Sequence, residues 1–253
     1  MPDAALLLLP GMALNATIFP AFAVPTTAPD FSSGPGAPGA GFAAYRAALD
    51  RLTDTDAWRT ASRRIVVGHS FGGMLALSWL LADGGTGRPL INGLVLIATT
   101  AGPMYDAATV RFGPLRIPTR PLMALWNHPV VTAGAKLLLG AGRTSDVDFQ
   151  RYRRRSEIAV GLAGWRLTSV AGRRAYRAAM TGFDVRDRLG QMRVPTIVLH
   201  GTRDTYFRTP VAEALARGLP EAELRLVRGA RHVLPITHPE PVERAVADLI
   251  GSA

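Results

Sequence analysis

The chain carries several short runs of apolar residues, each ended by a turn-forming or polar residue. Runs of this length are too short and too apolar for exposed helices and are typical of strands buried on both faces of a sheet. A further short run, Ala21 to Val24, is interpreted as a minor strand. The main predicted strands are Ala5 to Leu9, Ile65 to Val67, Leu94 to Ala98, Thr196 to His200 and Leu224 to Val227.

Stretches with helical spacing of apolar residues lie between these strands. Phe42 to Leu52 and Phe71 to Ala82 are the clearest examples. Alternation of strands with helices requires right-handed crossovers, which produce a parallel sheet. We therefore predict an α/β protein with a mostly parallel sheet and helices on both faces.

The interval between Ala98 and Thr196 breaks this alternation. It is rich in Pro and Gly up to about residue 142, and helices are predicted around residues 146–160 and 169–180, with no predicted strand. We interpret residues 101–193 as a helical lid inserted over one edge of the sheet. Residues 1–100 and 194–253 then form the core.

Composition narrows the class of protein. The 253 residues include 48% hydrophobic residues and no cysteine, so disulfides, thiol nucleophiles and thiolate metal sites are excluded. Residues 4–29 are uncharged and include Ala21 to Ala23, which is similar to a signal-peptidase site. Met1 to Asp3 has no basic residue, however, and prolines interrupt the stretch too often for a signal core or a membrane helix. We expect a cytoplasmic protein without a membrane span.

Positive charge is concentrated in the middle of the chain. Residues 101–193 hold 16 Lys and Arg against 6 Asp and Glu, which equals the whole net charge of +10. Such a segment could steer an anionic substrate or an acidic carrier protein, or it could be a solvated arginine-rich face. The arginines at 151 and 153–155 lack the interleaved aromatic residues of a base-stacking surface, so we expect no nucleic acid partner.

One short motif carries chemistry. Gly68-His69-Ser70-Phe71-Gly72 matches G-x-S-x-G and lies at the end of a predicted strand and the start of a predicted helix. A serine at such a tight corner is exposed at the carboxyl edge of the sheet, and the helix N-terminus favours negative charge beside it. The alternative interpretation is a glycine-rich turn with an incidental serine.

With this motif the chain resembles the α/β-hydrolase superfamily, and the resemblance extends from Ala5 to Ile250. In that family an acid and a histidine follow the serine in chain order, each after a later strand. Asp204 follows the strand ending at His200, and His232 follows the strand ending at Val227. The resemblance therefore implies a catalytic triad of Ser70, Asp204 and His232, in which the imidazole activates the hydroxyl and the carboxylate orients the imidazole.

Other histidines and acids compete for these roles. His69 lies inside the corner and should point away from the serine, and His200 is interpreted as a core histidine. His238 is expected to begin the last helix, and His128 is either structural or a substrate contact. Asp106 is the alternative acid.

The resemblance also implies an oxyanion hole built from the backbone N–H groups of Phe71 and Met12. The family usually has His-Gly where this chain has Pro10-Gly11, but a backbone donor needs no particular side chain. We expect a sheet of six strands, without the antiparallel hairpin that opens many family members.

The implied reaction is hydrolysis of a carboxylic ester of a small or medium apolar substrate through a serine ester, with no metal and no organic cofactor. Alternatives are a thioesterase or carrier-linked ester hydrolase, a C–C hydrolase, lyase, cyclase or perhydrolase, and a non-catalytic ligand-binding relative. The substrate would be a small molecule, with anionic or carrier-linked forms among the options, and the pattern gives no oligomeric state. The residues expected to line the pocket are Met104, Tyr105, Met123 and Trp126.

Overall fold

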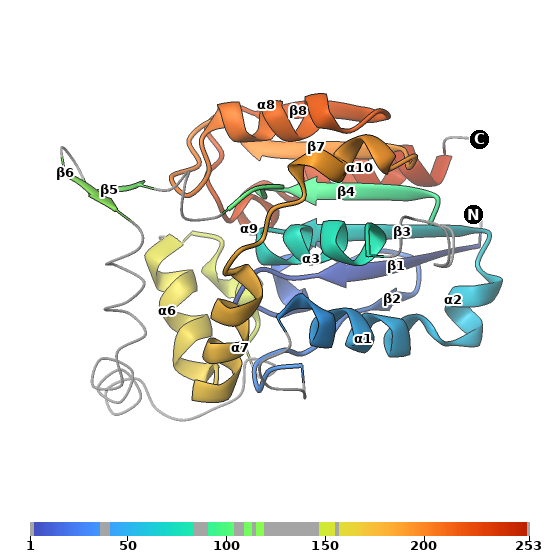
Figure 1. Ribbon diagram of the computed structural model, residues 1–253, viewed down its shortest axis with the longest axis horizontal. Coiled ribbons are helices and arrows are strands. Elements are labelled where there is room, and N and C mark those ends of the chain that lie inside the picture. The colour runs from blue at the N-terminus through green and yellow to red at the C-terminus, as the bar shows by residue number, and fades with distance from the viewer. Residues whose placement is uncertain are drawn as a thin grey trace.

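A six-stranded, wholly parallel sheet forms the centre of the molecule, in the order β2-β1-β3-β4-β7-β8 (Figure 1). The structure, a computed structural model, describes residues 3–35, 41–82, 91–103, 109–112, 115–118, 147–154 and 157–251. The strands of the sheet are β1 Ala4–Leu9, β2 Thr26–Thr27, β3 Arg63–His69, β4 Gly93–Ile97, β7 Thr196–Gly201 and β8 Ala222–Val227.

The predicted parallel sheet is confirmed, with one correction at its edge. No strand forms at residues 21–24, and β2 lies at Thr26–Thr27 instead. The pairing explains the shift, because Leu6 and Leu7 of β1 face Thr26 and Thr27, and the N–H of Leu6 donates to the carbonyl of Pro25 at 2.9 Å. Backbone groups within reach of β1, rather than apolar side chains, determine where this strand forms.

Both faces of the sheet are buried, which is why its strands are continuously apolar. Leu7 and Leu9 of β1 belong to the core on one face, whereas Leu6 and Leu8 belong to the core on the other. The same alternation continues in β3, where Leu7 pairs with Val66. The side-chain period of a strand therefore divides one apolar run between two cores.

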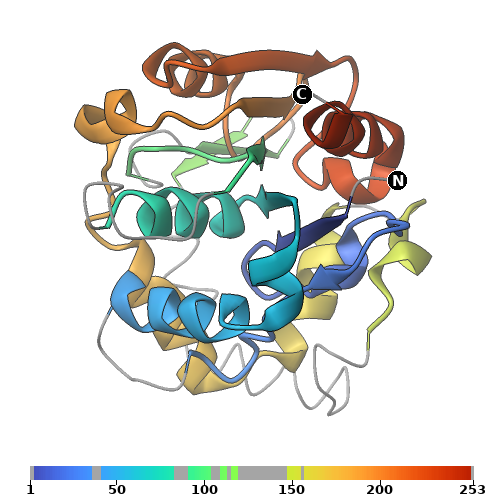
Figure 2. The same cartoon turned by 90° about the vertical axis from the view of Figure 1, so that its right-hand side faces the viewer.

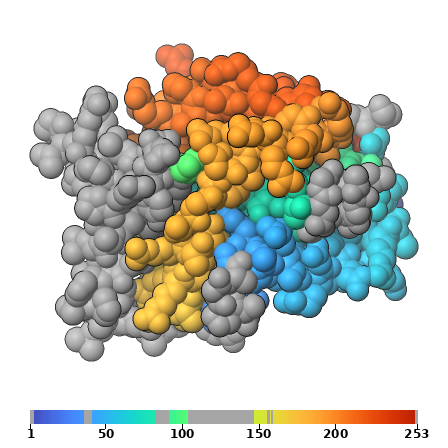
Figure 3. All heavy atoms as spheres, viewed as in Figure 1, coloured from blue at the N-terminus to red at the C-terminus, as the bar shows by residue number. Residues whose placement is uncertain are grey.

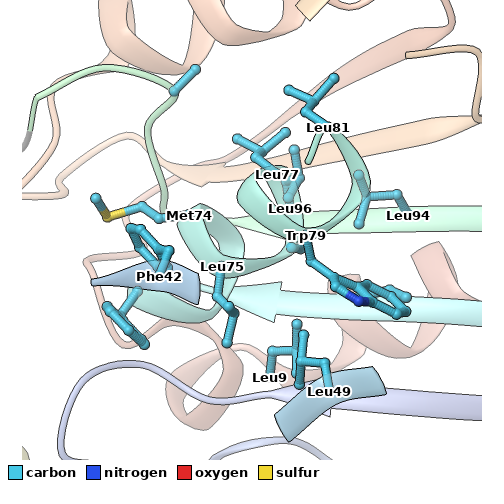
Figure 4. Packing of buried hydrophobic residues seen from close by; sticks show 14 of the residues in the cluster. Leu9, Phe42, Leu49, Met74, Leu75, Leu77, Trp79, Leu81, Leu94 and Leu96 are labelled. Carbon is cyan, nitrogen blue, oxygen red and sulfur yellow. The ribbon is translucent and has the colours of Figure 1, made fainter. Parts of the chain in front are cut away.

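Helices cover the two faces (Figure 2). Leu9 and Leu96 of the sheet pack with Leu49 of α1 and with Met74 and Leu75 of α3 (Figure 4). One face is covered by α1 Phe42–Thr53, α2 Asp56–Thr60, α3 Phe71–Leu80 and α8 Thr209–Gly218, and the other by α9 Leu234–Thr237 and α10 Pro239–Gly251.

The segment between β4 and β7 contains strands as well as helices. The prediction of helices alone is wrong here, because β5 Thr109–Phe112 and β6 Leu115–Pro118 form an antiparallel pair. The sequence carried a signal for it, since two four-residue stretches with alternating arginine and apolar residues flank Gly113-Pro114. The helix expected around 146–160 is replaced by the 3-10 helix η3 Phe149–Tyr152 and the start of α6 Glu157–Leu167, whereas α7 Val170–Met180 agrees with prediction.

Helices α6 and α7 lie beyond the carboxyl ends of the central strands (Figure 1). Aromatic rings anchor α7 to the sheet domain, because Phe71 of α3 lies 4.8 Å from Tyr176 of α7 and 5.1 Å from Tyr45 of α1, measured between ring centroids. In Figure 3 α7 and the segment after it form a continuous band beside α1. That segment includes the 3-10 helix η4 Arg186–Gln191. Within the described ranges, the helices are all too short or too polar to cross a membrane.

Candidate active site

Ser70 occupies a sharp corner between β3 and α3. Its φ of 51° lies in the left-handed region, where a residue other than glycine is strained by roughly 1–3 kcal/mol. Hydrogen bonds hold the corner, since the Ser70 N–H donates to the Ile97 carbonyl at 2.9 Å and the Thr99 hydroxyl donates to the Ser70 carbonyl at 2.7 Å. The corner is therefore fixed by β4 and the residues that follow it.

The glycines of the motif allow three backbones to pass closely at this corner. A Cβ atom at Gly72 would lie 1.9 Å from the carbonyl oxygen of Leu9, and one at Gly68 would lie 2.8 Å from the carbonyl oxygen of Gly72. Neither contact is possible for a real side chain. The G-x-S-x-G spacing thus packs β1, β3 and the start of α3 against one another.

The structure brings Ser70, Asp204 and His232 together. The Ser70 hydroxyl donates to Nε2 of His232 at 2.9 Å, and Nδ1–H of His232 donates to Oδ2 of Asp204 at 2.9 Å. Asp204 follows β7 and His232 follows β8, so the parallel strands deliver both side chains to the same edge of the sheet. These contacts form a continuous hydrogen-bonded chain from carboxylate to hydroxyl.

The two loops that carry Asp204 and His232 are joined to each other. The Arg203 N–H donates to the Ala230 carbonyl at 2.9 Å, and a Cβ atom at Gly201 would lie 2.4 Å from the same oxygen. The other carboxylate oxygen of Asp204, Oδ1, accepts from the N–H of Tyr206 at 2.7 Å. This hydrogen bond therefore orients the Asp204 carboxylate independently of its contact with the imidazole.

Electrostatics couple the carboxylate to the imidazole. Burial opposes a charge on His232, but the Asp204 carboxylate outweighs that effect by charge and hydrogen bonding, and the pKa of His232 is raised. Burial likewise opposes the charge on Asp204, yet the neighbouring His232 lowers the pKa of that carboxyl. The pair thus favours an imidazolium beside a carboxylate once His232 accepts a proton.

His69 supports the other side of His232. Its Nε2–H donates to the main-chain carbonyl of His232 at 2.9 Å, and the ring centroids lie 5.2 Å apart. Burial, followed by the proximity of His232, lowers the pKa of His69 to about 3, so its ring is neutral near pH 7. The sequence predicts that the His69 side chain points away from Ser70, and it gives no signal for this contact with His232.

Of the three remaining histidines, His200 and His238 lie within the described residues. His200 is buried in β7 as expected, and its Nε2–H donates to the Phe207 carbonyl at 3.1 Å. His238 directly precedes α10 as expected, and its Nδ1 accepts from the Thr237 hydroxyl at 2.9 Å. His128 lies outside the described residues, as does the alternative acid Asp106.

The two proposed oxyanion donors lie on segments next to Ser70. Phe71 is the first residue of α3, and Met12 lies in the turn after β1 that the Leu14 N–H closes onto the Gly11 carbonyl at 3.1 Å. No hydrogen bond from the N–H of Met12 or Phe71 occurs within the part of the chain that the structure describes. The pocket residues expected from the sequence, Met104, Tyr105, Met123 and Trp126, lie outside the described residues.

Residues near His232 that were not singled out from the sequence include Glu157 and Tyr206. The Val233 N–H donates to Oε1 of Glu157 in α6 at 3.1 Å, and the Tyr206 ring lies 4.5 Å from the His232 ring. No spacing along the chain points to Glu157, because 76 residues separate it from Val233. The described residues include no cluster of three or more His, Asp or Glu that could hold a metal ion.

Solved structures with similar folds cover almost the whole chain. An esterase from Rhodococcus sp. ECU1013 has a TM-score of 0.70 at 18% identity, with 98% of this chain and 90% of that chain covered. An enol-lactonase from Burkholderia xenovorans LB400 has a TM-score of 0.69 at 15% identity, with coverage of 98% and 92%. At these identities the likeness concerns the fold alone.

Sequence comparison gives one local match and one that spans the chain. The local match is to the polyketide synthase ThaQ of Burkholderia thailandensis, 38% identical over 71 residues, which cover 28% of this chain and 3% of the synthase. The sequence model of the alpha/beta hydrolase family matches residues 6–245. With the parallel sheet and the strand-corner-helix motif in place, this match shows that the chain belongs to the alpha/beta hydrolase family.

Proposed function

We propose that the protein is a serine hydrolase that cleaves a carboxylic ester of a small or medium apolar substrate through an acyl-enzyme intermediate on Ser70. The observation that carries the proposal is the pair of 2.9 Å contacts linking Ser70, His232 and Asp204. A hydroxyl of ordinary acidity is a weak nucleophile, and an imidazole oriented by a carboxylate is the group that activates it.

In the proposed reaction, Ser70 Oγ attacks the ester carbonyl carbon while Nε2 of His232 takes the hydroxyl proton. Asp204 stabilises the resulting imidazolium, which then gives its proton to the departing alcohol. Water attacks the acyl-enzyme with His232 as the base, releasing the acid and restoring Ser70. The raised pKa of His232 and the lowered pKa of Asp204 both favour this transient ion pair.

The negative oxygen of the tetrahedral intermediate would be held by the N–H groups of Met12 and Phe71. Phe71 contributes the N-terminus of α3, where the helix dipole adds to the hydrogen bond. In enzymes of this chemistry, loss of one oxyanion donor reduces turnover by about 100- to 1,000-fold. The turn after β1 should therefore tolerate little movement.

We assign residues 1–100 and 194–253 to the hydrolase core and residues 101–193 to a lid. The position of α6 and α7 beyond the carboxyl ends of the strands supports this division (Figure 1). Within the lid, Met104, Tyr105, Met123 and Trp126 remain the proposed substrate contacts. The reaction requires neither a metal nor an organic cofactor, because the three side chains supply the nucleophile, base and acid.

Labelling with a fluorophosphonate tests the nucleophile directly. Mass spectrometry should find the adduct on the peptide that contains Ser70, and Ser70→Ala should abolish it. His232→Ala should reduce ester turnover by at least about 1,000-fold. The matched control His238→Ala should leave turnover unchanged, because His238 contacts Thr237 rather than the proposed triad. Absence of labelling in folded protein would overturn the proposal and favour a ligand-binding role.

A thioesterase or carrier-linked ester hydrolase is the second candidate. The net charge of +10 on residues 101–193 favours an acidic carrier, and so does the local match to a polyketide synthase. Parallel assays with p-nitrophenyl esters and acyl thioesters of increasing chain length separate the two candidates. Thioester turnover that falls steeply with added salt would favour the second, whereas salt-independent ester turnover would favour the first.

A further inference from the structure

Helix α6 contacts the loop after β8 through one carboxylate. This loop carries His232 and Val233 and is called the base loop below. Glu157 stands in the first turn of α6, and its Oε1 accepts a hydrogen bond of 3.1 Å from the N–H of Val233. Val233 immediately follows His232 and is buried. This N–H and the His232 carbonyl that accepts from His69 belong to the same peptide group. Glu157 and His69 therefore hold that peptide group from opposite sides, next to the imidazole.

The titratable groups around His232 come from several elements. Asp204 and Tyr206 come from the loop after β7, His200 from β7, His69 from the end of β3, and Glu157 from α6. Burial lowers the pKa of His69 and of His200 and raises that of Tyr206, so these three groups are neutral near pH 7. The negative charges near the imidazole thus come from Asp204 and Glu157, and both raise the pKa of His232.

We propose that Glu157 is a positioning residue for His232, which holds the base loop through Val233 and adds a second negative charge that favours the imidazolium formed during the reaction. The proposal rests on the proposed function, since it assigns His232 as the base. It also assigns a role in the reaction to α6, a helix that lies outside the sheet. The charge is partly exposed to solvent, so its effect should be smaller than that of Asp204.

Glu157→Gln separates the charge from the hydrogen bond. Glutamine keeps an oxygen that can accept from Val233 but carries no charge. Without that charge the pKa of His232 falls, and since the neutral imidazole is the active form, the acidic limb of kcat/KM should move to lower pH. The plateau value of kcat should stay within about threefold of the parent enzyme.

Glu157→Ala removes both contributions. It should shift the pH profile in the same direction and lower the plateau kcat by about tenfold with KM nearly unchanged, because the backbone beside the base loses its anchor. The matched control is Glu240→Gln on α10, an exposed carboxylate that pairs with Arg153 at 3.3 Å. It removes the same charge without touching the base loop and should leave both the pH profile and kcat unchanged.

Two outcomes would overturn the inference. Superimposable pH profiles for the parent and both Glu157 variants would show that neither the charge nor the hydrogen bond matters. An equal shift in Glu240→Gln would show that the effect is not specific to Glu157. Thermal unfolding of each variant verifies the fold, and Glu157→Gln remains informative where alanine destabilises α6. Fluorophosphonate labelling of the parent protein distinguishes the failures, because an unlabelled parent refutes the proposed function, whereas a labelled parent with unshifted variants refutes this inference alone.

Discussion

Replacing Gly164 by alanine should separate helix α6 from the turn that carries the proposed oxyanion donor. A Cβ atom at Gly164 would lie 2.0 Å from the carbonyl oxygen of Ala13 and 3.0 Å from its carbonyl carbon. Ala13 follows Met12 and has a φ of 63°, so this turn is already held in a strained conformation. Because the opposing atoms belong to the backbone, no side chain can rotate to make room.

The size of the effect follows from the distances. Ordinary contacts of a Cβ atom begin at 3.4 Å, so α6 and the turn must move apart by more than 1 Å in total. Overpacking of this kind costs about 1–3 kcal/mol, partly offset by about 1 kcal/mol from the better helix propensity of alanine. Stability should therefore fall by at most about 2 kcal/mol. A 1 Å displacement of the proposed oxyanion donor should lower turnover by about 100-fold.

Gly161→Ala is the matched control on the same helix. A Cβ atom at Gly161 meets no atom of the described residues within 4 Å. The substitution should raise the free energy of unfolding by up to about 1 kcal/mol through helix propensity and leave kcat unchanged. Ester turnover and urea unfolding, measured for both variants, provide the comparison. Full activity in Gly164→Ala with unchanged stability would refute the reasoning, as would an equal loss in Gly161→Ala.

Three further predictions concern buried polar groups. His69→Leu should lower kcat by about tenfold, because the His232 carbonyl loses its hydrogen-bond donor. His69→Gln should retain most activity, because it keeps an N–H near the position of Nε2. Equal losses of kcat for the two variants in steady-state assays would argue against this role of His69. Neutral His69 contributes stability that is fully present above pH 6.5 and falls as the pH drops towards the His69 pKa of about 3. The loss is up to about 1.4 kcal/mol per pH unit. Between pH 7 and 5, the free energy of unfolding in urea should therefore depend less steeply on pH for His69→Gln than for the parent protein. Tyr45→Phe should raise the free energy of unfolding by about 1 kcal/mol, since the buried Tyr45 hydroxyl has no hydrogen-bond partner among the described residues, and a loss of stability would show that this hydroxyl is satisfied.

The central strands could be predicted from the sequence because burial on both faces leaves a simple signal. The run from Ala4 to Leu9 is apolar at every position, and every residue of it is buried. Ala21 to Val24 carries the same kind of signal, yet no strand forms there. An edge strand depends on which backbone groups can reach its neighbour, and composition alone does not contain that information.

The site divides in the same way between local and long-range causes. The five-residue motif and its glycines made the Ser70 corner predictable from the sequence, although hydrogen bonds to Ile97 and Thr99 also hold it. The position of His232 depends on groups that are far away in the chain, because His69 holds its carbonyl and Glu157 holds the next N–H. Neither contact follows from spacing, because each arises only when the sheet has brought the ends of β3 and β8 and the start of α6 together.

This difference predicts where the proposed site should be most sensitive to substitutions outside the triad. Changes near Ser70 act through backbone contacts and should affect folding, as the 1.9 Å approach at Gly72 indicates. Changes near His232 act through single hydrogen bonds on a loop and should affect turnover while the sheet remains folded. A variant at Glu157 or His69 that unfolds the protein, rather than slowing it, would contradict this division of roles.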